Sequence, residues 1–284
     1  MSKKLFSRLF VFLLVVGLLF GASQAVQAAT PTVVSTEAEL RAALADPSVS
    51  FIDLGASFTL AATVDVNRSV SIDGKDFIIT GPPKGTEIWE GHGLDVTAND
   101  VSISNLTITG SGRSNLVFYN VTGGSVTDVT LTNAAHAGMI VNSSAVTISG
   151  VTTINNAWGG INVDQGDGLI TTPLLTVLDV TVHTSPAGTL TPAIWVDTGN
   201  AAWVVGASDL FIVVAPPGQP LVFFDIAEFT EAYPVHNVTQ DTYFTTIQSA
   251  IDAATAGDTI EVADGTYDYD SEGHPADKIG RAHV

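Results

Sequence analysis

One apolar phrase, a short hydrophobic strand that opens on a small residue, returns six times between residues 93 and 223. Each copy has a hydrophobic anchor at its second position, and the anchors are Leu94, Leu116, Met139, Ile161, Ile194 and Leu221. Successive anchors are separated by 22, 23, 22, 33 and 27 residues. Spacings in this range are typical of stacked repeats, in which one unit cannot bury its apolar face alone and covers it with the next unit. The spacing therefore predicts a solenoid.

A second phrase runs in phase with the first and begins at Asn105, Asp128, Gly150, Asp179 and Asp209. Alternation with period two places Leu106 and Ile108 inside and the threonine between them outside. Two such strands per repeat, joined by Gly, Asn, Asp and Ser corners, describe a coil. Leucine-rich repeats would need a leucine-dense return segment, and a propeller blade would need about twice the period. We therefore expect an all-β fold, a right-handed parallel β-helix with coils about 4.8 Å apart.

The first 28 residues predict export from the cell. Lys3, Lys4 and Arg8 precede an unbroken apolar run over residues 9–20, and small residues end this segment at Ala28. This order is that of a secretory signal peptide, with cleavage expected after Ala28. The alternative, a membrane span, needs about 20 apolar residues. We expect a secreted or surface-displayed protein, with no transmembrane segment in the mature chain.

Charge narrows the range of partners. Without residues 1–28 the chain has seven basic and 29 acidic residues, a formal charge of −22, and none of the 164 residues between Arg113 and Lys278 is basic. Such a surface repels nucleic acid and anionic membranes, and it predicts no clamp of cations for a polyanion. Cysteine is absent, so disulfides do not stabilise the fold, and a mature chain of this length can bury a core without them.

The repeat region, residues 29–232, begins with a predicted cap. Thr36 and Glu39 have the spacing of a capping box, and Leu40, Ala43 and Leu44 form one apolar stripe behind it. A short helix here would cover the open edge of the first coil. Strands are expected next at residues 51–54, 64–66, 70–72 and 77–80.

Residues 233–277 begin the same order again. An amphipathic helix is predicted over residues 243–254, followed by a strand at 257–262 and a turn at 265–267. This stretch resembles the opening cap of pectin-lyase-like right-handed β-helix proteins, which are common among large bacterial surface proteins, and residues 30–232 are similar to the same superfamily. The resemblance implies the fold and brings no catalytic signature. We expect residues 233–277 to be the truncated start of a second β-helix.

The last residues, 278–284, have a separate interpretation. Ile279–Val284 is the translation of ATC GGA AGA GCA CAC GTC, the start of a sequencing-library adapter, and the preceding AG would complete a codon for Lys278. We therefore interpret residues 278–284 as an adapter artefact and infer no function from them.

Lyase and esterase chemistry is disfavoured. The resemblance implies that a lyase would use a basic side chain beside a uronate, with calcium bridging carboxylates, and that an esterase would use two aspartates and an arginine. Arg113 is the only basic residue on the regular coils, and the equivalent positions of the next two coils hold His136 and Trp158.

A hydrolase is the enzyme that the sequence favours. Asp164 and Asp197 each lie three residues after an anchor, and Asp167 follows closely. Two carboxylates stacked on neighbouring coils repel each other, which raises one pKa and separates an acid from a base. An inverting glycosidase holds its two carboxylates about 6.5–9.5 Å apart, and Asp167 could supply this wider spacing. The same aspartates could be turn residues beside glycine, or could bind Ca²⁺. We expect no other cofactor and no other metal site.

Aromatic side chains are the candidate ligand-binding residues. Trp158, Trp195 and Trp203 could stack on sugar rings beside the longer excursions near residues 165–176 and 183–192, or they could pack beneath those excursions. We expect Asn133, Asn155 and Asn156 to form an amide ladder between coils, and we expect each histidine at the surface or at a corner. The resulting hypothesis is a spacer or adhesive module for neutral carbohydrate or another cell surface. An inverting glycoside hydrolase is the alternative.

Overall fold

A computed structural model describes residues 30–87, 90–166, 174–179, 182–197, 201–207, 210–213 and 220–264. The predicted signal peptide, Asp167 and the segment 265–284 lie outside these described residues. The chain divides into two units between Thr30 and Pro31, and every element named below belongs to the second unit.

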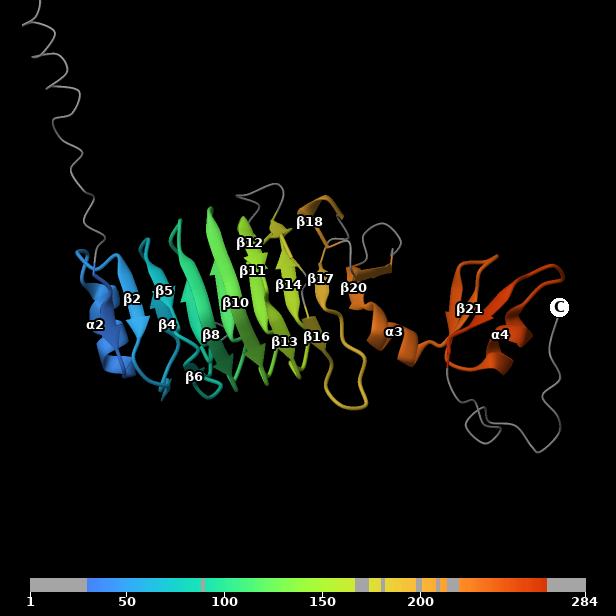
Figure 1. Ribbon diagram of the computed structural model, residues 1–284, viewed down its shortest axis with the longest axis horizontal. Coiled ribbons are helices and arrows are strands. Elements are labelled where there is room, and N and C mark those ends of the chain that lie inside the picture. Colours follow the sequence, from blue (N-terminus) through green and yellow to red (C-terminus); the bar gives the residue numbers. More distant parts are fainter. Residues whose placement is uncertain are drawn as a thin grey trace, which may run out of the picture. The chain divides into compact units, whose positions relative to one another are not determined.

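The described chain winds into coils with three strand-bearing faces, visible as successive strands in Figure 1. The first face holds β1 (Thr32–Val34), β2 (Phe51–Leu54), β5 (Ser71–Asp73), β12 (Val146–Ser149), β15 (Leu175–Val177) and β18 (Val204–Val205). The second face holds β3 (Phe58–Thr59), β6 (Ile78–Thr80), β13 (Thr152–Ile154) and β16 (Val182–Thr184). The long strands β8 (Ser102–Thr109) and β10 (Gly124–Thr132) run through both faces and join them into one twelve-stranded sheet.

The third face is an eight-stranded sheet. Its strands are β4 (Val64–Val66), β7 (Leu94–Val96), β9 (Leu116–Tyr119), β11 (Met139–Asn142), β14 (Ile161–Asp164), β17 (Ile194–Val196), β20 (Leu221–Asp225) and β19 (Leu210–Val213). From β4 to β17 every neighbouring pair in this sheet is parallel. The predicted parallel β-helix is thus confirmed.

The bend between the first two faces depends on residues that adopt a left-handed backbone. Asn105 and Asp128 have φ of 49° and 52° in the middle of β8 and β10, and Gly150 has φ of 62° at the same corner of the next coil. Asn, Asp and Gly adopt this conformation at little cost. At these three corners the first residue of the second phrase therefore turns the chain by its own backbone preference.

The anchors stack in register through the regular coils. Leu94 pairs with Leu116, which pairs with Met139, and the series continues through Ile161 to Ile194. The 33-residue spacing between the last two leaves this register intact. Side chains from all three faces form one buried cluster inside the coils.

The sixth anchor was predicted wrongly. β20 runs antiparallel to β17, so Leu221 pairs with Val196 and Phe223 pairs with Ile194. β19, expected in phase with the second phrases, instead pairs antiparallel with β20 in the eight-stranded sheet. Antiparallel partners can be joined by a short connection, whereas a parallel partner needs a full return around the coil. The chain reverses here and ends the regular coils.

The phrase at Asp179 is displaced by one residue, which exchanges its two faces. Thr153 pairs with His183, so Val182 is 47% exposed and the imidazole of His183 lies inside the coil at 3% exposure. The expectation that each histidine lies at the surface or at a corner is therefore wrong for His183. Its Nδ1 lies 2.8 Å from the Thr153 hydroxyl, and Thr191 provides partners for Nε2 at 3.1 Å.

The predicted cap helix is confirmed as α2 (Glu37–Ala45), with Leu40, Ala43 and Leu44 buried. The Thr36 hydroxyl accepts from the Glu39 backbone N–H at 3.2 Å, as a capping box requires. The Glu39 carboxylate accepts from Ser35 N–H at 2.7 Å, one residue before the expected donor.

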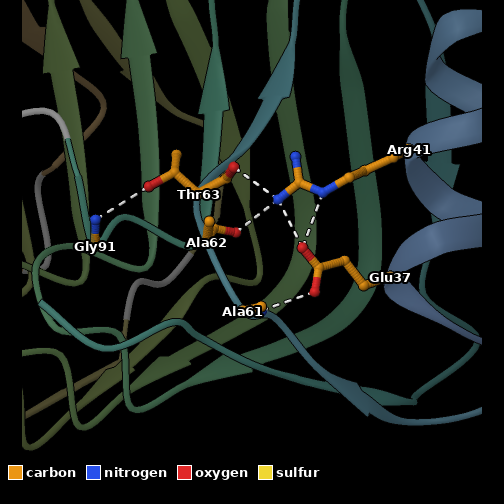
Figure 2. Close-up of polar contacts among 6 residues, drawn as sticks. All are labelled: Glu37, Arg41, Ala61, Ala62, Thr63 and Gly91. Carbon is orange, nitrogen blue, oxygen red and sulfur yellow. Dashed lines mark hydrogen bonds and ion pairs between the residues drawn. The ribbon is translucent and has the colours of Figure 1, made fainter. Parts of the chain in front are cut away.

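An ion pair within α2, between Glu37 and Arg41, is hydrogen-bonded to the backbone of the first coil, and Figure 2 shows these contacts. Arg41 donates to the carbonyl oxygens of Ala62 and Thr63, both at 2.9 Å, and to Glu37 Oε1 at 2.8 Å. Glu37 Oε2 accepts from Ala61 N–H at 2.7 Å. Partial burial alone would raise the pKa of Glu37, but these hydrogen bonds outweigh it and lower that pKa. Arg41 is thus committed to the framework.

The amide ladder is confirmed at the corner before the eight-stranded sheet. Asn155 Nδ2 donates to Asn133 Oδ1 at 2.6 Å, on the neighbouring coil. The buried Asn156 accepts from Ala134 N–H and donates to the Leu131 carbonyl, both at 2.9 Å. The Asn156 amide thereby satisfies two backbone groups that the corner leaves outside the strand ladders.

The predicted second start contains its helix and its strand. After α3 (Ile226–Ala232), the strands β22 (Thr242–Phe244) and β23 (Ile260–Val262) flank β21 (Val235–Asn237), and both are antiparallel to it. α4 (Ile247–Ala253) begins at Thr246, whose hydroxyl accepts from Ser249 N–H at 3.1 Å. That these elements open a second β-helix remains a prediction.

Candidate functional site

The outward side chains of the eight-stranded sheet form two columns, here called the outer face. The first column is Asp65, Asp95, Val117, Ile140, Asn162, Trp195 and Val222. The second column holds Tyr119, Asn142 and Asp164, and Asp197 follows the strand beside Asp164. The period of two that buries the anchors also turns these residues outward.

The two predicted carboxylates lie on adjacent coils. Val163 pairs with Val196, and Asp197 N–H donates to the Val163 carbonyl at 3.0 Å, so Asp164 and Asp197 occupy equivalent positions. Burial raises the pKa of Asp197 and the charge of Asp164 adds to this increase, while a 3.2 Å hydrogen bond from Asn162 opposes it. Asp164 Oδ1 accepts from Gly166 N–H at 2.9 Å, which is also the geometry of a turn residue.

The three tryptophans occupy different environments. Trp195 is half-buried on the outer face, and its indole Nε1 is buried with no hydrogen-bond partner among the described residues. Trp158 is 55% exposed at the corner before β14 and stacks on His136, with ring centroids 3.9 Å apart. Trp203 ends the short 3₁₀ helix η1 (Ala201–Trp203) and is 3% exposed inside the core. Trp203 therefore offers no ring face to a ligand, unlike the other two.

Asp95 is a feature of the outer face that the sequence analysis missed. Burial raises the pKa of Asp95 to about 6, with a further contribution from Asp65 on the neighbouring strand. Its Oδ1 is buried without a hydrogen-bond partner in the described part of the chain. The sequence does place an aspartate, Asp65 or Asp95, at the centre of each of two short apolar strands. These strands are 30 residues apart, which is outside the regular period, so their pairing was not predicted.

Within the described ranges, no group of three or more His, Cys, Asp and Glu side chains is placed to hold a metal ion. Asp167, the third residue of the predicted calcium and hydrolase group, lies outside those ranges. No helix of the described residues is both long enough and apolar enough to cross a bilayer.

Stacked parallel coils around one buried core define a parallel β-helix, consistent with the pectin-lyase-like architecture. Within it, residues 32–158 match the family model described as "Putative pectate lyase-like adhesive domain". That match ends at Trp158, before Asp164, Trp195 and Asp197. Neither the search of curated proteins nor the search of solved structures found a significant match.

Proposed function

We propose that this β-helix is an extracellular spacer and adhesive module, and that its outer face binds neutral carbohydrate at Trp195. The adhesive family of residues 32–158 supports the general role. Carbohydrate binding at this position is supported by the outward orientation of Trp195, which lies between Asn162 on one strand and Val222 on the next. An indole face stacks on sugar rings, and the neighbouring amide of Asn162 can bond hydroxyl groups.

Trp195→Ala tests this proposal. We expect the full chain to bind at least one neutral glycan on a panel of immobilised saccharides, and the variant to bind it about tenfold or more weakly, because it lacks the stacking surface. Phe51→Ala is the matched control, since Phe51 is an exposed aromatic on the twelve-stranded sheet. Equal binding by wild type and Trp195→Ala, or no neutral glycan bound by the wild type, would refute the proposal.

A glycoside hydrolase is the second candidate, favoured by the adjacent carboxylates of Asp164 and Asp197. Adjacent strands lie about 4.8 Å apart, which is less than the roughly 6.5–9.5 Å that an inverting mechanism needs for its water. The spacing is closer to the roughly 5–5.5 Å of a retaining pair, but Asp164 and Asp197 accept hydrogen bonds from Gly166 and Asn162 within the fold. We expect binding without turnover, with Asp197→Asn retaining the glycan affinity of the wild type. The measurement is release of reducing sugar from the bound glycan. Release by the wild type that disappears in Asp197→Asn would establish the hydrolase instead.

A further inference from the structure

Five lysine and arginine residues lie in the described part of the chain, and three of them serve the framework. Arg41 holds the first coil as described above. Arg68 donates to the carbonyl oxygens of Leu44 and Ala43, both at 2.8 Å, and so caps the end of α2. Lys75 lies 2.6 Å from Asp73 and 3.3 Å from Asp53. Each of these cations has its partners within the fold.

The other two cations, Lys84 and Arg113, make no side-chain hydrogen bond and no ion pair with any described residue. The Nε atom of Arg113 is buried, so an N–H of its guanidinium is removed from water without a partner. An unsatisfied buried donor is costly, and more so on a charged group. The nearby carboxylate of Glu90 is turned into its own loop, where it accepts from Thr86 and Glu87 N–H at 2.7 and 3.1 Å.

The fold brings Lys84 to Arg113 through close backbone packing. Gly112 N–H donates to the Pro82 carbonyl at 2.8 Å, and a Cβ at Gly112 would lie 2.0 Å from the backbone nitrogen of Lys84. Only glycine allows the loop to approach the coil this closely. Both cations also act on His136, whose pKa is lowered by burial and then by the charges of Arg113 and Lys84. A neutral imidazole therefore lies beside two positive charges.

An aromatic platform continues this cluster. Arg113, His136 and Trp158 occupy the same corner of three successive coils, linked by backbone hydrogen bonds of 3.3 Å from His136 to Arg113 and from Trp158 to His136. The rings of His136 and Trp158 stack with an interplanar angle of 8°. We name Lys84, Arg113, His136 and Trp158 the cationic corner.

We propose that the cationic corner binds an acidic saccharide unit, a sugar ring that carries a carboxylate or a sulfate group. The guanidinium of Arg113 and the ammonium of Lys84 meet the anion, and the exposed indole of Trp158 takes the ring face. The inference rests on the proposed carbohydrate binding, but it adds a second site, away from Trp195, that prefers an anionic sugar to a neutral one. It differs from the expectation of no cation clamp, which was based on the long stretch without basic residues after Arg113.

Calorimetric titration of the full chain with three small probes tests the inference. The probes are methyl β-glucuronide, glucose 6-sulfate and methyl β-glucoside. We expect one or both of the anionic probes to bind about tenfold or more tightly than the glucoside. This preference should weaken between about 50 and 500 mM salt, because screening acts on the charge contacts. The stronger anionic probe identifies the group that the corner prefers.

Lys84→Gln and Arg113→Gln should each remove most of the anion preference, and Trp158→Ala should weaken binding of the preferred anionic probe. Lys75→Gln is the matched control, because it makes the same charge change at a cation that already has partners. Lys84 is exposed, so its variant keeps the test valid even where Arg113→Gln fails to fold. Equal affinity for glucuronide, sulfate and glucoside, or a preference that survives Lys84→Gln, would overturn the inference. Neutral-glycan binding that depends on Trp195 would still stand in that case.

Discussion

Phe118→Ala is expected to lower the free energy of unfolding by about 4 kcal/mol, the largest effect of any substitution considered for this chain. Phe118 has no exposed surface, and it lies between Val96 and Val141 in the inner column of the eight-stranded sheet. Its ring also packs against Gly124, where an added Cβ would lie 3.0 Å from the ring edge. The parallel ladders fix the neighbouring coils, so the cavity left by the ring cannot close.

Urea denaturation followed by circular dichroism measures this loss. Phe51→Ala is the control, because Phe51 is 44% exposed and the same substitution there should cost less than about 1 kcal/mol. Similar midpoints for the two variants would mean that the Phe118 ring does not contribute to the core as the structure describes.

Asp95→Asn is expected to stabilise the protein at neutral pH, by about 2 kcal/mol. Folding raises the pKa of Asp95 from 3.8 to about 6, so the folded chain holds this proton more tightly than the unfolded chain does. The carboxylate therefore destabilises the fold above about pH 6, and the penalty disappears as the pH falls toward 3.8. An asparagine has no such charge to bury, and its advantage should be large near pH 8 and small near pH 4.

Asp73→Asn provides a control of opposite sign. Partial burial opposes ionisation of Asp73, but hydrogen bonds from Lys75 and Asn105 outweigh this and lower its pKa. The Asp73 carboxylate therefore contributes stability above its unfolded pKa, and Asp73→Asn should destabilise the fold at neutral pH. Urea midpoints of wild type and both variants across this pH range provide the comparison. A stability gain from Asp95→Asn that is the same at both ends of the range would contradict the assigned titration.

The regular coils were predictable because one physical requirement repeats in every coil. Each anchor must face the interior and each corner must tolerate a left-handed residue, so both signals appear at the same spacing from Leu94 to Ile161. The prediction was wrong where the same local pattern fits two strand directions or two registers. Leu221 belongs to a good apolar strand in either direction, and its direction follows from the antiparallel pairing of β20 with β19. The strand that holds His183 is shifted by one residue, so the imidazole lies in the core. There it contacts the buried hydroxyl of Thr153.

The candidate sites divide in the same way. The equivalence of Asp164 and Asp197 followed from counting residues after the anchors, and the structure places the two side by side. Trp203 could not be assigned to a face, because it lies outside the repeated strands. The pair of Lys84 and Arg113 was beyond sequence reasoning, since these residues are 29 positions apart and meet only because the loop packs against Gly112. Counting positions succeeds within the regular coils and fails for loops.

The reversal at β20 limits how such a molecule can grow. A stack whose last strand ran parallel would offer the next chain an edge with the same hydrogen-bond pattern as its own first coil, and such edges favour uncontrolled polymerisation. In the eight-stranded sheet the final strands β20 and β19 run the other way, and α2 packs beside β1 at the start of the coils. At this end the eight-stranded sheet therefore offers a further copy of the chain no parallel edge of the kind that its own coils use.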